Sequence, residues 1–159
     1  MILGALAGGV IGTAVLTTLL RTASELGLTR IDLPFLLGTA VTSHRSRAKA
    51  LGYIAHFGFG LLFAFLYALI FEAVGRSGWL FGAALGLVHG LFAATSLVNV
   101  LLPVVHPRMG APWTDASSSP FVEPPGFLLR NYGRGTAWVS TVGHVVYGAI
   151  VGGFAAWGS

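Results

Sequence analysis

Cysteine is absent from this 159-residue chain, which excludes disulfide bonds and metal sites built from thiolates. Charged side chains are scarce: Asp, Glu, Lys and Arg together make up 9% of the residues, against roughly 25% in soluble domains. Hydrophobic residues make up 55% of the chain. Apolar runs of about 20 residues, long enough to cross the hydrocarbon core of a bilayer, recur along the sequence. The sequence therefore predicts an all-α, polytopic membrane protein, because the helices of a soluble domain would carry polar faces.

Familiar catalytic motifs are missing as well. The chain has neither a glycine-rich phosphate-binding loop followed by Lys nor a His-Glu-x-x-His zinc motif. No lysine lies deep within an apolar run, which excludes a Schiff base to retinal. Asp115 and Glu123 fall in a proline-rich loop, where acidic side chains are usually solvated. These absences favour a protein that is not an enzyme.

Four apolar segments have the length of a membrane span. We expect one integral membrane domain covering residues 1–159, folded as a four-helix transmembrane bundle. In the first polar stretch, Asp32 precedes Leu33-Pro34 and is expected to cap a short interfacial helix over residues 35–41. The predicted spans are 2–20, 48–73, 79–102 and 136–157, and the polar loops are 21–47 and 103–135.

Basic residues gather in and beside the two polar loops. The chain has nine Lys and Arg residues, and all except Arg76 lie within residues 21–49 or 103–135. The positive-inside rule predicts that both loops are cytoplasmic and that both chain ends face the periplasm of a bacterial inner membrane. The same charges suit anionic lipid head groups, so the bilayer is an expected partner and nucleic acid is not. Glu72 is placed to pair with Arg76 one helical turn later.

Two sequence patterns repeat along the chain. The first and third spans each carry a row of glycines, one per helical turn, which lets a neighbouring helix approach closely. The second and fourth spans share the pattern His-x-x-aromatic-Gly, beginning at His56 and His144. We therefore expect two tandem two-helix hairpins in the same orientation. The glycines expected to mediate helix packing are Gly4, Gly8, Gly12, Gly82, Gly86 and Gly90.

Histidines are the polar side chains that lie deep in the predicted spans. His56 and His144 are expected at similar depths, and His89 lies near the middle of the third span, with Ser96 and Asn99 continuing its face. Hydrocarbon offers no hydrogen bonds, so a polar side chain at this depth needs a partner. The sequence therefore predicts that these histidines face the interior of the bundle.

Three interpretations of the histidines remain open. Each ring could be hydrogen-bonded within the bundle, for example to Ser140 or Tyr147. Alternatively, His56 and His144 could ligate haem b or a metal ion, with His89 as a further candidate. Gly60 and Gly148, one turn after each histidine, would then leave room for a macrocycle. The third interpretation is a pathway for protons or a substrate.

Several short motifs occur in a distinctive order along nearly the whole chain. They are His56-Phe57-x-x-Gly60, His106-Pro107-Arg108-Met109, Glu123-Pro124-Pro125-Gly126-Phe127, Asn131-Tyr132-Gly133 and His144-Val145-Val146-Tyr147-Gly148. Together they resemble a family of small bacterial inner-membrane proteins with four predicted spans and no assigned activity. The resemblance implies a four-helix membrane protein and carries over no catalytic residue.

The sequence leaves three functional hypotheses. The leading one is an accessory or assembly subunit of a larger membrane complex, or a bundle that associates with itself. The second is a haem- or metal-binding membrane protein that uses the histidines. The third is a proton-coupled carrier, for which an unpaired carboxylate inside the membrane would be expected.

Overall fold

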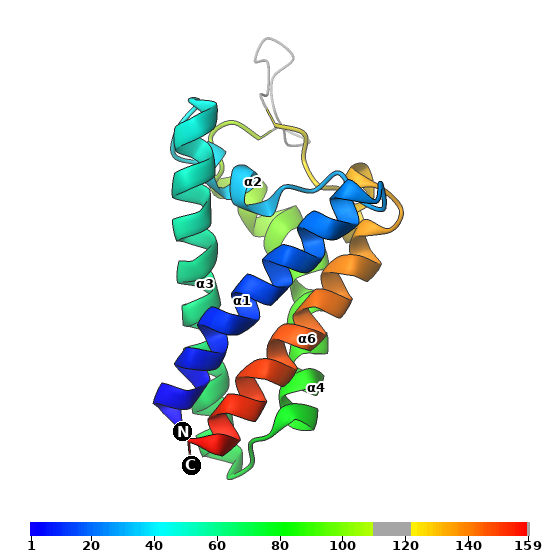
Figure 1. Cartoon of the computed structure of the whole chain (residues 1–159). Helices are drawn as coiled ribbons and strands as arrows, with labels where there is room; N and C mark the ends of the chain where they lie inside the picture. Colours follow the sequence, from blue (N-terminus) through cyan, green and yellow to red (C-terminus); the bar gives the residue numbers. More distant parts are fainter. Residues whose placement is uncertain (110–121, 159) are drawn as a thin grey trace.

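The computed structural model describes residues 1–109 and 122–158, and these are largely helical, with no β-strand. Four helical stretches are long and apolar enough to cross a membrane: Ile2–Glu25, Arg45–Val74, Trp79–Val105 and Thr136–Trp157. The predicted all-α membrane bundle is therefore confirmed (Figure 1). The elements are α1 (Ile2–Glu25), α2 (Leu33–Thr39), α3 (Arg45–Val74), α4 (Trp79–Phe92), the π-helix η1 (Ala93–Leu101), α5 (Leu102–Val105), the 3₁₀ segment η2 (Phe127–Tyr132) and α6 (Thr136–Trp157).

The long helices alternate in direction. α1 and α4 run toward the end of the bundle that carries α2, and α3 and α6 run back from it (Figure 1). The hairpins α1–α3 and α4–α6 therefore have the same orientation, as the repeated patterns indicate. The connection that follows α1 and the described residues between α5 and α6 lie at the α2 end, and the short turn between α3 and α4 lies at the other.

Both glycine rows pack against the same helix, α6. A methyl group added to Gly8 would lie 2.9 Å from Cα of Val151, and one added to Gly86 would lie 2.9 Å from Cα of Val145. A strict twofold repeat would place the second row on α3, the counterpart of α6, so the two hairpins pack differently. The remaining glycines of the rows face α6 as follows: Gly4 meets Phe154, Gly12 meets Tyr147, Gly82 meets Gly148, and Gly90 meets His144.

The short helix α2 is held against the first turns of α3. Its predicted cap is confirmed, since Asp32 Oδ1 accepts a hydrogen bond of 3.0 Å from the Phe35 N–H. Gly38 and Gly52 let the two backbones touch: a methyl group on Gly38 would collide with the carbonyl of Ala48, and one on Gly52 with the carbonyl of Pro34. This glycine pair was not predicted from the sequence.

The turn between α3 and α4 differs from its prediction. α3 ends at Gly75, which adopts a left-handed conformation with φ of 69°. The Arg76 N–H then donates to the carbonyl of Phe71, so Arg76 has left the helix and no longer follows Glu72 on one face. The ion pairs within the described residues are Arg21–Glu25 and Arg30–Glu123, and the expected Glu72–Arg76 pair is not among them.

Candidate functional site

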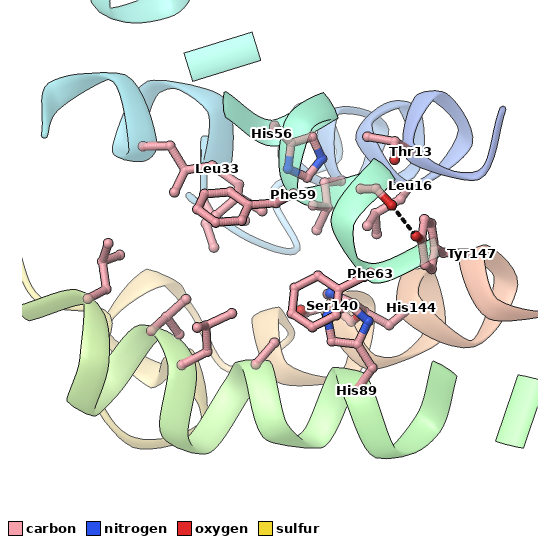
Figure 2. A pocket seen from close by; sticks show the side chains of 18 of the residues that line it. Thr13, Leu16, Leu33, His56, Phe59, Phe63, His89, Ser140, His144 and Tyr147 are labelled. Carbon is pink, nitrogen blue, oxygen red and sulfur yellow. Dashed lines mark hydrogen bonds between the residues drawn. The ribbon is translucent and has the colours of Figure 1, made fainter. Parts of the chain in front are cut away.

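A cavity of about 190 Å³ lies between α3 on one side and α4 with η1 on the other. α1 and α6 contribute further lining residues (Figure 2). Its walls are mostly apolar, and polar side chains gather toward one part of it. The polar lining residues are Thr13, His56, His89, Ser140, His144 and Tyr147.

One wall of the cavity is formed by η1, where the third span changes from α-helical to π-helical winding. Asn99 Nδ2 donates to the carbonyl of Ala94 at 2.6 Å, and its side chain is thereby folded back onto the backbone. The wider π winding changes which residues follow His89 on its face. The cavity lining therefore continues through Ala93, Leu97, Val98 and Leu101, and not through Ser96 and Asn99 as expected from the sequence.

His89 is held by aromatic neighbours on α3. The Phe63 ring lies over its imidazole, with centroids 3.8 Å apart and an interplanar angle of 32°. The Tyr67 hydroxyl is 3.3 Å from His89 Nδ1. Phe63 and Tyr67 were not predicted as site residues, although they follow His56 at about two and three helical turns and therefore share its side of α3.

His144 is oriented by its own helix and by His89. Its Nδ1 lies 2.7 Å from the carbonyl oxygen of Ser140, so Nδ1 carries the proton and donates it to that carbonyl. Its ring meets the His89 ring edge to face, with centroids 4.7 Å apart. Nε2 of His144 has no hydrogen-bond partner among the described residues and, in the neutral ring, can only accept. The bundle therefore presents an acceptor nitrogen from α6.

His56 lies across the cavity from this pair. Figure 2 shows its imidazole projecting from α3, whereas His89 and His144 lie on the opposite side. The side chain is 6% exposed, and its buried Nε2 has no hydrogen-bond partner among the described residues. A buried polar atom without a partner is rare and costs roughly 1–3 kcal/mol. This nitrogen is therefore a buried polar atom of the cavity wall that a guest could satisfy.

The space expected beside the histidines for a haem is not present at the two glycines, and the haem or metal site itself stays a prediction. Gly60 packs against the Thr13 side chain and Gly148 against the backbone of Gly82, so neither leaves room for a macrocycle. The cavity itself is close in size to one of roughly 150 Å³ that accommodates benzene. Among the described residues, no group of three or more His, Asp or Glu could hold a metal ion. His56 and His144 share one cavity, but the ring that contacts His144 is that of His89.

Another histidine, His106, has a structural role. It is 3% exposed because it packs under α2. Its Nε2 lies 3.1 Å from the carbonyl of Leu36 and 3.2 Å from Thr39 Oγ1, and its Nδ1 accepts from the Arg108 N–H at 3.2 Å. Burial lowers the pKa of His106 below its ordinary value. The Arg108 guanidinium donates to the carbonyls of Thr39 and Ala40 and so caps the end of α2.

The motifs around Glu123 and Tyr132 also fasten the loop. The Tyr132 hydroxyl donates to the carbonyl of Glu123, and Asn131 Nδ2 donates to the carbonyl of Pro124 at 2.8 Å. Burial, followed by the negative charge of Glu123, raises the pKa of Tyr132 to about 12. Arg30 is 3.7 Å from the Glu123 carboxylate. Asp115, the other acid of this loop, lies outside the described residues.

The comparisons with known proteins add no functional assignment. No family model, curated protein or solved structure matches the chain. The resemblance to the bacterial four-span family therefore stays a prediction.

Proposed function

We propose that this polytopic membrane protein has no catalytic machinery and holds a lipophilic molecule drawn from the bilayer. The observation that carries the proposal is the cavity between α3 and η1, whose lining combines exposed apolar side chains with buried histidines. Phe59, Leu101 and Val105 line it and are 48%, 50% and 72% exposed, respectively. These side chains belong to stretches that can cross a membrane, so their exposed surfaces face lipid. A bilayer molecule could therefore enter sideways without crossing water.

The size and lining of the cavity suit an apolar guest. Ligand sites in proteins are mostly apolar, with a few polar groups that fix the orientation of the ligand. A space of about 190 Å³ takes one ring or a short length of acyl chain. The histidines would orient the polar end of that guest, and the leucines along η1 would contact its apolar part.

The packing of the glycine rows bears on the hypothesis of self-association. Rows of small residues on exposed helix faces often join two chains. Here Gly8 and Gly86 are both used within the chain, against α6. Self-association would therefore need a different surface. The form of the hypothesis that fits the cavity is an accessory subunit of a larger membrane complex. This subunit would hold a lipophilic molecule for its partner.

The other two functional hypotheses have less support. The haem hypothesis loses the support of Gly60 and Gly148, because both glycines pack against neighbouring helices. For a proton-coupled carrier, a carboxylate in the pathway would be expected, but the described lining of the cavity contains neither Asp nor Glu. The polar side chains of the lining are Thr, Ser, Tyr and His, with no Asp, Glu, Lys or Arg, and such a lining suits an uncharged molecule.

We further propose a bacterial inner membrane, with the α2 end of the bundle in the cytoplasm and the α3–α4 turn in the periplasm. The support is the charge distribution. Both basic connections lie at the α2 end, and Arg76 alone lies at the other. Anionic lipids would then be the neighbours of the α2 end.

The binding proposal is tested by measuring which lipophilic molecules stay bound to the protein during purification. The chain is purified from membranes in mild detergent, and an organic extract is compared by mass spectrometry with that of variants. Ala93 is buried and lines the cavity, so Ala93→Phe should fill it and strongly reduce the retained lipophile. Ala84→Phe, on the exposed face of α4, is the matched control and should retain it. Equal retention by the two variants, or none by the unmodified chain, would contradict the proposal.

A further inference from the structure

We propose that the cavity recognises the ring of a quinol-type lipid, a membrane molecule whose aromatic head carries two hydroxyl groups and an apolar tail. This inference rests on the binding function proposed above and specifies the chemistry of the guest. It is carried by three features of the cavity: an acceptor nitrogen from α6, a buried nitrogen without a partner on α3, and an aromatic lining between them.

The hydrogen-bonding groups on the two sides of the cavity are complementary to a quinol. His144 Nδ1 donates to the Ser140 carbonyl, which leaves Nε2 as an acceptor that a donor from the guest can use. The neutral His56 ring has one N–H and one lone pair, and its buried Nε2, which has no partner among the described residues, carries one of the two. One hydroxyl of the guest can donate a hydrogen bond to His144 Nε2. The second hydroxyl can either donate a hydrogen bond to His56 or accept one from it.

The placement of these groups favours a ring over a simple alcohol. His56 and His144 come from opposite sides of the cavity (Figure 2). A quinol has a hydroxyl at each end of its ring and can form hydrogen bonds with both sides of the cavity. A fatty alcohol has a single hydroxyl and can form a hydrogen bond with only one side. Phe59, Phe63 and Tyr147 also line the cavity, and aromatic side chains pack well against a planar ring.

The remaining lining provides a path for the tail. Leu97, Leu101 and Val105 follow one another along η1 and α5, and Leu33 and Leu37 face the same cavity from the α2 region. Leu101 and Val105 are among the exposed lining residues described above. A tail that leaves the ring along this path would remain in contact with hydrocarbon and reach the surrounding bilayer.

The fixed tautomer of His144 predicts which redox form binds. A quinone has two carbonyl oxygens, which only accept, so it cannot satisfy an acceptor nitrogen. The quinol supplies the missing proton. Because one neutral buried hydrogen bond changes affinity by about tenfold, the quinol should bind about tenfold more tightly than the quinone of the same skeleton.

The experiment uses the full chain in nanodiscs of phosphatidylcholine and phosphatidylglycerol, under anaerobic conditions. Three probes with the same tail are titrated by calorimetry: decyl-benzoquinol, decyl-benzoquinone and decylbenzene, each corrected for partition into empty nanodiscs. We expect the quinol to bind most tightly. His56→Phe keeps a ring of similar size but removes both nitrogens, and it should weaken binding of the quinol about tenfold while leaving its preference over the quinone, which rests on His144. His44→Phe, an exposed histidine outside the cavity, is the matched control and should leave the order of affinities unchanged.

The outcomes separate this inference from the binding function on which it rests. If all three probes bind equally and Ala93→Phe abolishes their binding, the cavity holds lipophiles but does not recognise a quinol, and the inference is overturned while the function stands. If no probe binds, both are overturned. Tighter binding of the quinone than of the quinol would also overturn the inference, and this comparison uses the unmodified chain, so it does not depend on whether a variant folds.

Discussion

The imidazole rings of His89 and His144 meet edge to face, with centroids 4.7 Å apart and an interplanar angle of 73°. The contact joins α4 to α6 beside Gly90, whose missing side chain leaves space for the His144 Cβ. Two histidines on neighbouring spans therefore form one polar unit, in which each ring has a separate partner of its own: Tyr67 for His89 and the Ser140 carbonyl for His144. The orientation of both rings is set before any guest arrives.

The first prediction concerns proton positions. His144 should carry its proton on Nδ1, because that atom faces the Ser140 carbonyl at 2.7 Å. His106 should carry its proton on Nε2, because that atom faces the Leu36 carbonyl and its Nδ1 accepts from the Arg108 N–H. Nitrogen chemical shifts of the histidine-labelled protein near pH 8 should show the two opposite tautomers, with His144→Gln and His106→Gln identifying the signals. The same tautomer at both rings would contradict this reading of the hydrogen bonds.

The second prediction concerns the glycine rows. Gly8→Leu or Gly86→Leu should destabilise the bundle by about 1–3 kcal/mol or more, because each side chain would press on the backbone of α6. Gly58→Leu on α3 is the control, since nothing lies within 4 Å of a methyl group there. Thermal unfolding in detergent measures the difference. The packing described here is wrong if the two row variants melt at the same temperature as Gly58→Leu.

The third prediction concerns pH. His106 is buried in the folded chain with its pKa lowered from 6.5, so below pH 6.5 the unfolded chain binds a proton more readily than the folded one. The contribution of His106 to stability is therefore fully present above pH 6.5 and is lost as the pH falls below it.

A variant isolates this contribution. The amide of Gln can still donate to the Leu36 carbonyl but does not titrate, so His106→Gln should lose less stability than the unmodified chain between pH 7.5 and about 5. His44→Gln replaces an exposed histidine and should behave like the unmodified chain. Melting temperatures at several pH values test both statements. If His106→Gln shows the same pH dependence as the unmodified chain, protonation of His106 does not destabilise the protein.

The fourth prediction concerns orientation. The chain has no cysteine, so single cysteines can be introduced into a clean background. A membrane-impermeant maleimide added to intact cells should label Ser77→Cys, in the α3–α4 turn, and should label Ser43→Cys at the α2 end only after the cells are opened. Reporter fusions near residues 117 and 159, both outside the described residues, should score cytoplasmic and periplasmic, respectively. The reverse labelling pattern would place the basic connections outside the cell.

Local patterns were enough to predict the helical architecture. Length and apolarity predict the spans, and Asp32 before Leu33-Pro34 predicts the start of α2, because a capping side chain acts within its own turn. Rows of small residues indicate close helix packing but do not show which helix they face. Both rows pack on α6 because of the way in which the four spans are arranged. The positions of the glycines in the sequence do not indicate that arrangement.

The arrangement of the histidines could be predicted only in part. Burial of His56 and His144 follows from their depth in apolar segments. The contact between His89 and His144 depends on how α4 is rotated against α6, and the path beyond His89 depends on the π winding of η1, for which the sequence shows no periodic signal. The burial of His106 depends on α2 folding back over it, a long-range contact that no local pattern encodes.

The position of α6 between the two glycine rows has a consequence for biogenesis. Of the four spans, α6 is the last to leave the ribosome, and the glycine rows of both α1 and α4 pack on it. The two glycine rows can therefore reach their packed positions only after the fourth span is inserted, whereas the contact of Gly9 with Ala64 joins α1 to α3 without it. Ser140 and His144 arrive with it, so the bundle closes and the cavity acquires part of its polar lining in the same late step.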